Sequence, residues 1–204
     1  MRPMNTDLHN TVIEDARHWL ETAVIGLNLC PFAKASYNKS LVHLVVAPAQ
    51  TEEQALQQAH DELIALAELP MQERETTLMM FPAMFDDFLY FNDFVGAVED
   101  ILADLELEGI LQVATFHPRY QFDGTEPDDI TNATNWAPYP TLHLLREESI
   151  DRAVDSYPDV DAIPDNNMKL LEEMGKEGWD KLNIQTRVSP DEWVKACPMH
   201  GGKD

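Results

Sequence analysis

The residue types best suited to chemistry gather in one stretch of the chain, residues 116–146. It reads FHPRYQFDGTEPDDITNATNWAPYPTLHLLR and contains two His, two Arg, four acidic residues, two Tyr and a Trp. An imidazole can act as acid and base near neutral pH, and a carboxylate can orient it or bind a metal ion. The stretch has little helical period and lies between two apolar segments, so we predict a long loop that carries a binding or catalytic site.

His117 is the first candidate for a catalytic acid or base, because it follows an apolar segment predicted to be a strand. A His at such a strand end would face the edge where open α/β sheets bind ligands. Asp123 is the predicted catalytic partner, which would orient His117 or hold a divalent ion. The alternative is a His hydrogen-bonded to a loop carbonyl, and we prefer this alternative for His143, which is also a substrate-binding candidate.

Cys30 is the third catalytic candidate, and it has two interpretations. It follows the end of a predicted helix, where the helix dipole disfavours a thiolate, so burial as a small apolar side chain is preferred. Alternatively, the following loop brings the thiol to His117, which would create a nucleophile or a pair of metal ligands. Cys197 and His200 lie three residues apart, but two ligands do not make a zinc site.

Cations and polar aromatic side chains in the same stretch could recognise a small organic or anionic substrate. Arg119 and Arg146 could each form two hydrogen bonds to one carboxylate or phosphate. Each could equally be held by one of the many local acids. The predicted substrate-binding residues are Arg119, Tyr120, Asn135, Tyr139, His143 and Arg146.

The segment DGTEPDD, residues 123–129, is the predicted place for a divalent metal ion. It lacks the spacing and the terminal Glu of a calcium-binding helix–loop–helix motif. Asp128 and Asp129 could still supply one or two oxygen ligands to an ion such as Mg²⁺. The preferred alternative is a turn at Asp123-Gly124 followed by a helix cap.

Apolar segments alternate with amphipathic ones along the chain, which predicts an α/β fold. We expect about four mainly parallel strands with helices packed on the sheet faces. Three of the strands end at a proline, and parallel strands would bring Pro48, Pro82 and Pro118 to one edge of the sheet. The predicted strands cover residues 41–47, 76–81, 110–117 and 140–146.

The predicted helices rest on apolar periods of three and four residues and on capping signals. The whole chain, residues 1–204, is predicted to be one domain, with residues 178–204 as a weakly patterned C-terminal extension. The predicted helices cover residues 6–28, 51–69, 86–105, 149–157 and 164–174, with a short one that starts at Ser189.

Composition excludes several classes of partner. The net charge is −23, from 37 acidic and 14 basic residues, so we expect no binding to nucleic acid or anionic membranes. The N-terminus lacks the apolar core of an export signal and the two Cys suit free thiols, so we expect a cytoplasmic protein. From Asp86 to Asp129 there are twelve acids and one cation, Arg119. This excess predicts a solvated surface; the alternatives are a DNA-mimicking decoy, metal binding, or a face that docks a basic partner.

Three segments resemble a bacterial family catalogued as domain of unknown function 1415. They are NLCPFA (28–33), FHPRYQFDGT (116–125) and TNWAPYPTLHLLRE (134–147), and the resemblance spans nearly the whole chain. The family reads Asn-Arg-Ser-Pro where this chain has Asn-Trp-Ala-Pro at 135–138, so the cation at the second position is missing here. The resemblance implies a cytosolic bacterial protein of one domain, and it implies no activity, cofactor or catalytic residue.

Two functional hypotheses follow from these residues. The first is an enzyme that acts on a small organic or anionic substrate through the 116–146 loop, with a possible divalent metal ion. The alternative is a non-catalytic module that binds a ligand in the same cleft or docks a partner on its acidic face. An enzyme needs a second titrating or electrophilic group within hydrogen-bond reach of His117, which a binding module does not need.

Overall fold

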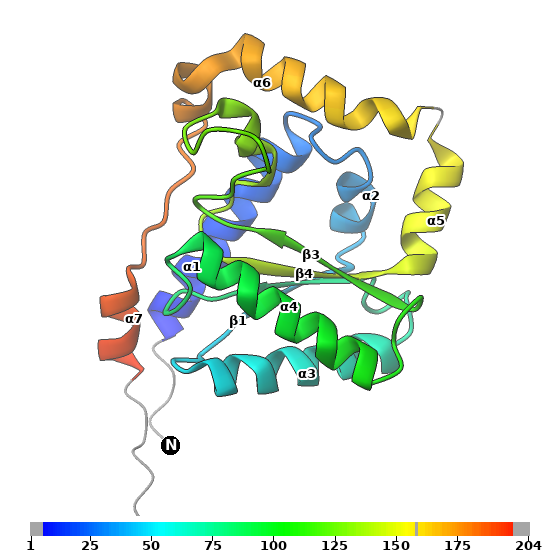
Figure 1. The fold of residues 1–204 in the computed structure, drawn as a ribbon, viewed down its shortest axis with the longest axis vertical. Helices are drawn as coiled ribbons and strands as arrows, with labels where there is room; N and C mark the ends of the chain where they lie inside the picture. Colours follow the sequence, from blue (N-terminus) through cyan, green and yellow to red (C-terminus); the bar gives the residue numbers. More distant parts are fainter. Residues whose placement is uncertain (1–5, 158, 198–204) are drawn as a thin grey trace, which may run out of the picture.

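Four strands form one sheet in the computed structural model, which describes residues 6–157 and 159–197 (Figure 1). They are β1 (Val42–Val46), β2 (Thr76–Met80), β3 (Leu111–Phe116) and β4 (Thr141–Arg146), in the order β1-β2-β4-β3. β1 and β2 are parallel, whereas β4 is antiparallel to both of its neighbours. The α/β class is confirmed, but the sheet is mixed, and the prediction of a mainly parallel sheet was wrong.

The direction of β4 follows from the connection that precedes it. Helix α3 (Glu52–Glu68) joins β1 to β2 and helix α4 (Phe88–Asp104) joins β2 to β3, and such crossovers return the chain in the same direction. Between β3 and β4 lies only a loop with a 3-10 turn, η2 (Ile130–Asn135), so β4 starts at the edge where β3 ends. β4 therefore runs back between β2 and β3 and separates them.

This topology still brings the three proline-marked strand ends to one edge. Because β4 is antiparallel to both β2 and β3, those two strands point the same way, as does β1. Pro48, Pro82 and Pro118 all follow the ends of these strands. We call this end of the sheet, where β1, β2 and β3 finish, the proline edge.

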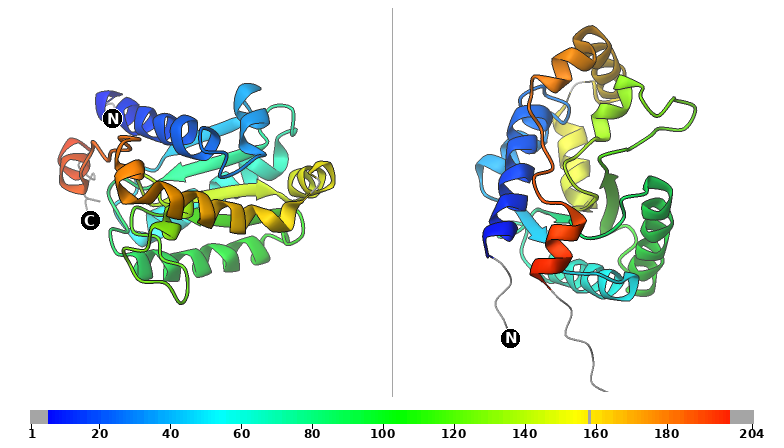
Figure 2. Two further views of the ribbon diagram at one scale, coloured as in Figure 1. Left: turned by 90° about the horizontal axis from the view of Figure 1, so that it is seen from above. Right: turned by 90° about the vertical axis from the view of Figure 1, so that its left-hand side faces the viewer.

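Helices α3 and α4 lie together on one face of the sheet (Figure 2). Each begins at a side-chain cap: Thr51 accepts a hydrogen bond from the backbone of Gln54, and Asp87 accepts one from the backbone of Tyr90. Phe91 and Phe94 of α4 are buried against the sheet and are at most 1% exposed. Neither helix contains a Lys or Arg.

The opposite face is covered by α1 (Thr6–Trp19) with its π-helical continuation η1 (Leu20–Ile25), and α6 (Ile163–Asp180) packs on η2 and adds Leu171 and Trp179 to the same core. Helix α2 (Ala33–Asn38) packs on η1, helix α5 (Glu147–Ser156) follows β4 directly, and a 3-10 turn, η3 (Val160–Ala162), leads into α6. Gly175, predicted to end a helix, has a φ of 61° and interrupts α6 there. None of the helices in the described part of the chain combines the length and apolar character needed to span a bilayer.

The chain after α6 returns along the molecule beside α1 (Figure 1, orange) and leads into helix α7 (Pro190–Ala196), the last helix of the described residues. The predicted start signal of α7 is confirmed, because Ser189 and Glu192 form a reciprocal capping box. Trp193 of α7 is fully buried in the core on the α1 side. Much of the weakly patterned extension is thus packed, and residues 198–204, including His200, lie outside the described residues.

Candidate functional site

His117 lies at the proline edge as predicted, and it is fully buried. Its Nε2–H donates to the carbonyl oxygen of Phe85 at 2.8 Å, and its Nδ1 accepts from the backbone N–H of Arg119 at 2.9 Å. Phe85 has a φ of 65°, which is rare for an aromatic residue. Burial lowers the pKa of His117. Both ring nitrogens are thus engaged by main-chain groups, one in the turn before α4 and one in the loop after β3.

Cys30 and His117 belong to different sides of the sheet. His117 stacks on Phe91 with ring centroids 5.5 Å apart, within the α4 side of the core. Cys30 packs against the core on the α1 side and is half-buried. Burial raises the pKa of the Cys30 thiol, opposed by the N–H groups of Phe32 and Ala33. The structure therefore gives no support to a Cys30–His117 pair.

The polar residues of the 116–146 loop are largely bonded to one another. The side chain of Asn132, which is fully buried, accepts from Phe122 N–H and Thr125 Oγ1 and donates to the carbonyl of Glu126. Gly124 has a φ of 78°, which confirms the predicted turn at Asp123-Gly124. These bonds shape the loop from within.

The predicted substrate-binding residues of the loop also have internal partners. Asn135 donates to the carbonyl of Thr115 at 3.2 Å, beside the end of β3. The carbonyl of Tyr120 accepts from the indole N–H of Trp136 at 3.0 Å, and the Tyr120 ring packs on Phe88. These contacts give both residues a structural role, and their binding roles stay predictions.

The two predicted anchoring cations lie at opposite ends of the sheet. Arg119, near the proline edge, forms an exposed ion pair with Asp86 at 2.8 Å. Arg146 ends β4 at the other edge, roughly 17 Å away by the rise of five to six strand residues. Its guanidinium donates to the carbonyls of Leu66, Leu69 and Arg74, so it caps the C-terminal end of α3. One small substrate could not contact both cations.

The carboxylates predicted to bind metal have different surroundings. Asp129 caps η2 and accepts from the backbone N–H and the hydroxyl of Thr131, and these bonds lower its pKa. Asp123 and Asp128 are exposed. Among residues 6–157 and 159–197, no three His, Cys, Asp or Glu side chains are grouped so that they could share an ion. The metal site stays a prediction.

His143 lies in the middle of β4 on the α1 side of the sheet. It pairs with Leu78 of β2 and Ala114 of β3, and its ring lies 5.7 Å from that of Phe116. Its ring nitrogens have no hydrogen-bond partner within the described chain, and burial lowers its pKa to about 4. The expected bond to a loop carbonyl is therefore not found.

A buried network that sequence reasoning missed closes the proline edge. Asp15 of α1, 5% exposed, accepts from the hydroxyl of Tyr139 at 2.7 Å and from the backbone N–H of Arg187 at 3.0 Å. The Tyr139 oxygen in turn accepts from Val188 N–H. Burial and the Asp15 carboxylate raise the pKa of Tyr139. Tyr139 thus links α1 to the C-terminal segment, the stretch from the end of α6 to the start of α7.

The space left at the proline edge is small. A cavity of about 60 Å³ lies there, enough for about two water molecules at roughly 30 Å³ each. Thr186, Val188 and Pro190 of the C-terminal segment form one wall. The opposite wall comes from the strand ends and the loop: Phe81, Pro82, Met84, Asp86, His117, Pro118, Pro138 and Pro140.

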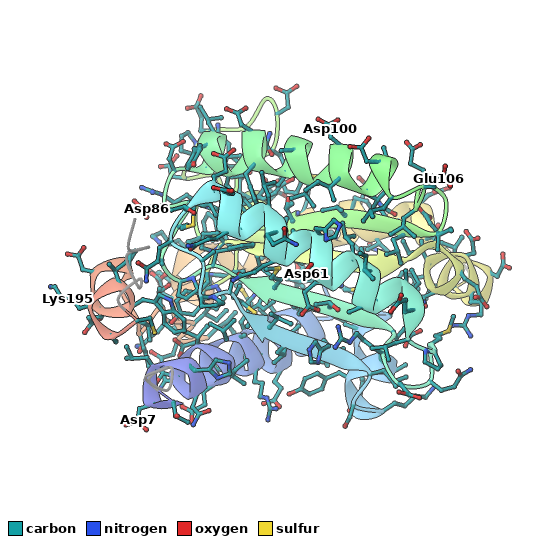
Figure 3. All side chains as sticks on the ribbon, turned by 90° about the horizontal axis from the view of Figure 1, so that it is seen from below. Asp7, Asp61, Asp86, Asp100, Glu106 and Lys195 are labelled. Atoms are coloured by element: carbon teal, nitrogen blue, oxygen red, sulfur yellow. The ribbon has the colours of Figure 1, made fainter. Side chains whose placement is uncertain are left out.

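The largest chemical asymmetry of the molecule is on the α3–α4 side. Between Glu52 and Glu108 there are fifteen acidic residues and one cation, Arg74, which pairs with Glu62 at 2.8 Å. Figure 3 shows Asp61 on α3, and Asp100 and Glu106 on and after α4, pointing away from the sheet. We call the exposed acids of these two helices the acidic layer: Glu52, Glu53, Asp61, Glu68, Asp93, Glu99, Asp100 and Asp104.

An open groove of about 460 Å³ runs along this layer. Leu56 of α3 and Ile101 of α4 form its apolar part. Its polar rim comes from one side of α3, where Glu52, Glu53, Gln57 and His60 line it. Sequence reasoning began the acidic run at Asp86 and missed the contribution of α3, which becomes adjacent only in the fold.

Comparison with known proteins agrees with the resemblance of the sequence segments. A family model described as "Protein of unknown function (DUF1415)" matches residues 11–181, which leaves out the C-terminal segment and α7. Searches of curated proteins and of solved structures found no match. The match covers most of the chain, and the chain therefore belongs to the DUF1415 family.

Proposed function

We propose that the chain is a non-catalytic docking module whose acidic layer binds a positively charged segment of a partner protein. The observation that carries the proposal is the absence of Lys and Arg from α3 and α4, which lie side by side. The cations of the chain are found on other elements, for example Lys169 and Lys176 on α6. The α3–α4 side thus carries acidic charge with few cations to balance it.

A one-sided field of this kind favours association with a basic surface. Acidic groups that lie closer together than the Debye length, about 8 Å at physiological salt, act on an approaching cation together. Such fields raise association rates by about 10- to 1,000-fold and lose this effect as salt increases. Acidic fields repel nucleic-acid phosphates, so the partner is a protein, and the segment that binds is rich in Lys and Arg.

The internal bonding of the 116–146 loop supports a binding module over the enzyme hypothesis. His117 uses both ring nitrogens on main-chain groups, and the cations Arg119 and Arg146 are held at opposite edges. A catalytic site needs a second group within reach of the acid or base. The acidic layer, in contrast, is exposed, and most of its carboxylates have no hydrogen bond or ion pair to other side chains of the described residues, apart from Glu52, which accepts from Tyr90, and Asp61, which accepts from Gln57.

Charge variants of equal net charge test the proposal. One variant removes three charges of the acidic layer, with Glu53→Gln, Glu99→Gln and Asp100→Asn. The matched control removes three charges from α6, with Glu172→Gln, Glu173→Gln and Glu177→Gln; all six residues are exposed. The probe is a fluorescent 16-residue peptide with six Lys, followed by anisotropy at 20 mM and 150 mM salt.

The acidic-layer variant should bind this peptide about 10-fold more weakly at low salt, because each nearby charge contributes a few tenths of a kcal/mol or more. The α6 variant should lose less than about 3-fold, which is the effect of net charge alone. Equal losses in the two variants would mean that the peptide senses only the net charge of −23, and the proposal would be withdrawn.

A further inference from the structure

The groove in the acidic layer combines apolar and acidic groups in one continuous surface. Its lining on α3 recurs at Glu52, Leu56 and His60, so it follows one side of that helix for two turns. Eight residues of helix span roughly 12 Å. This length matches two turns of a partner helix laid beside it.

Two exposed side chains with apolar parts lie at the start of α4, outside the lining of the groove. The hydroxyl of Tyr90 donates to Glu52 at 2.8 Å, so Tyr90 lies at the end of the groove where α3 begins. Tyr90 is 43% exposed, and its neighbour Leu89 is 71% exposed, the most exposed large apolar side chain of the described residues. Apolar patches with a polar rim, rather than single exposed apolar side chains, are typical of interaction surfaces.

The groove is open to solvent and lined by few residues, which suits a side chain of a macromolecule more than an enclosed small ligand. Carboxylates on its rim would pair with cationic side chains, while Leu56 and Ile101 would contact an aliphatic one. In a two-fold dimer formed through this groove, a second copy of this chain would place its own acidic layer here, and like charges would repel.

We infer that the groove between α3 and α4 binds an amphipathic, Lys-rich helix of a partner protein and takes an aliphatic side chain of that helix between Leu56 and Ile101. The inference rests on the proposed function and adds the anchoring contact. Helix-in-groove recognition places side chains at i, i+3 and i+4 into such a surface. Cationic residues on the flanks of that helix then face Glu52 and Glu53.

Two peptides of equal charge distinguish the apolar anchoring contact from the long-range electrostatic attraction. Both are 16-residue helical peptides with six Lys; one carries Leu along one face, and the other carries Ser at those positions. The protein should bind the Leu peptide about 10-fold more tightly, because a well-buried anchor contributes more than 1 kcal/mol. Leu56→Ala should abolish this preference and leave the affinity for the Ser peptide within about 2-fold. Ile110→Ala, a 52% exposed apolar residue outside the groove, is the matched control and should change neither affinity.

Amide chemical-shift mapping on the unmodified protein gives a second measurement that does not depend on a variant that folds. The Leu peptide should shift residues 52–60 and 97–101 most. Equal affinity for the two peptides, or shifts confined to other elements, would overturn the groove inference while leaving charge-dependent docking intact. If each peptide bound the unmodified protein and the acidic-layer charge variant with equal affinity, the proposed function would fail as well.

Discussion

Arg187 bonds to Asp15 twice, through its backbone N–H to Oδ2 at 3.0 Å and through its side-chain Nε–H to Oδ1. The two residues are 172 positions apart in the sequence. Asp15 is buried in α1, whereas the side chain of Arg187 is 44% exposed. A buried carboxylate therefore fastens the C-terminal segment, which lies outside the part of the chain matched by the family model, to the first helix.

Asp15→Asn should destabilise the fold by about 2 kcal/mol, because the buried carboxylate that accepts hydrogen bonds from Tyr139 and Arg187 becomes a neutral amide, while the Arg187 side chain stays half-exposed to water. Urea unfolding followed by circular dichroism measures the free energy of unfolding. Glu14→Gln is the matched control, since Glu14 pairs with the same Arg187 at 3.0 Å on the surface and should contribute less than about 1 kcal/mol. Similar losses in both variants would argue against a special role for the buried carboxylate.

Two adjacent threonines of β2 should respond in opposite ways to the same substitution. The Thr77 hydroxyl is buried without a hydrogen-bond partner, so Thr77→Val should leave stability unchanged or raise it by about 1 kcal/mol. The Thr76 hydroxyl donates to the carbonyl of Leu144 at 2.6 Å, so Thr76→Val should cost about 1 kcal/mol. Thermal unfolding of both variants tests this order, and a loss at Thr77 larger than that at Thr76 would refute it.

The strands and the proline edge could be predicted from the sequence because both depend on local pattern. Apolar β-branched runs and the prolines that follow β1, β2 and β3 are visible along the chain. The antiparallel direction of β4 could not be deduced from its own residues, because strand composition does not encode direction. The missing helix between β3 and β4 was the available signal, since parallel neighbours usually need a helical crossover.

The candidate site was harder to predict because its residue types suit two roles. His117 could titrate or brace a turn, and Arg146 could bind an anion or cap a helix. Only the partner in space decides, and those partners, Phe85 and Leu69, are distant in sequence. The Asp15–Arg187 pair had no local signature at all, because an acid on an amphipathic helix looks like any solvated residue.

Burial of His117 and partial burial of His143 predict a loss of stability in mild acid. Burial lowers the pKa of His143 from 6.5 to about 4 and also lowers the pKa of His117. In the unfolded chain both imidazoles return to a pKa of about 6.5, so between pH 6.5 and 4 the unfolded chain binds more protons than the folded one. The contribution of these histidines to stability is therefore fully present above pH 6.5 and is lost as the pH falls.

His143→Leu should remove much of this pH dependence, because leucine cannot titrate and His143 has no hydrogen-bond partner among residues 6–157 and 159–197 to lose. A pKa lowered to about 4 implies a loss of about 2 kcal/mol by pH 4.5. Urea unfolding at pH 7.5 and 4.5 compares the two proteins, and the variant should lose about 2 kcal/mol less than the unmodified protein. Between pH 7.5 and 8.5, where both imidazoles are neutral in either state, the difference between the two proteins should stay constant. An equal acid-induced loss in both proteins would show that His143 does not couple folding to protonation.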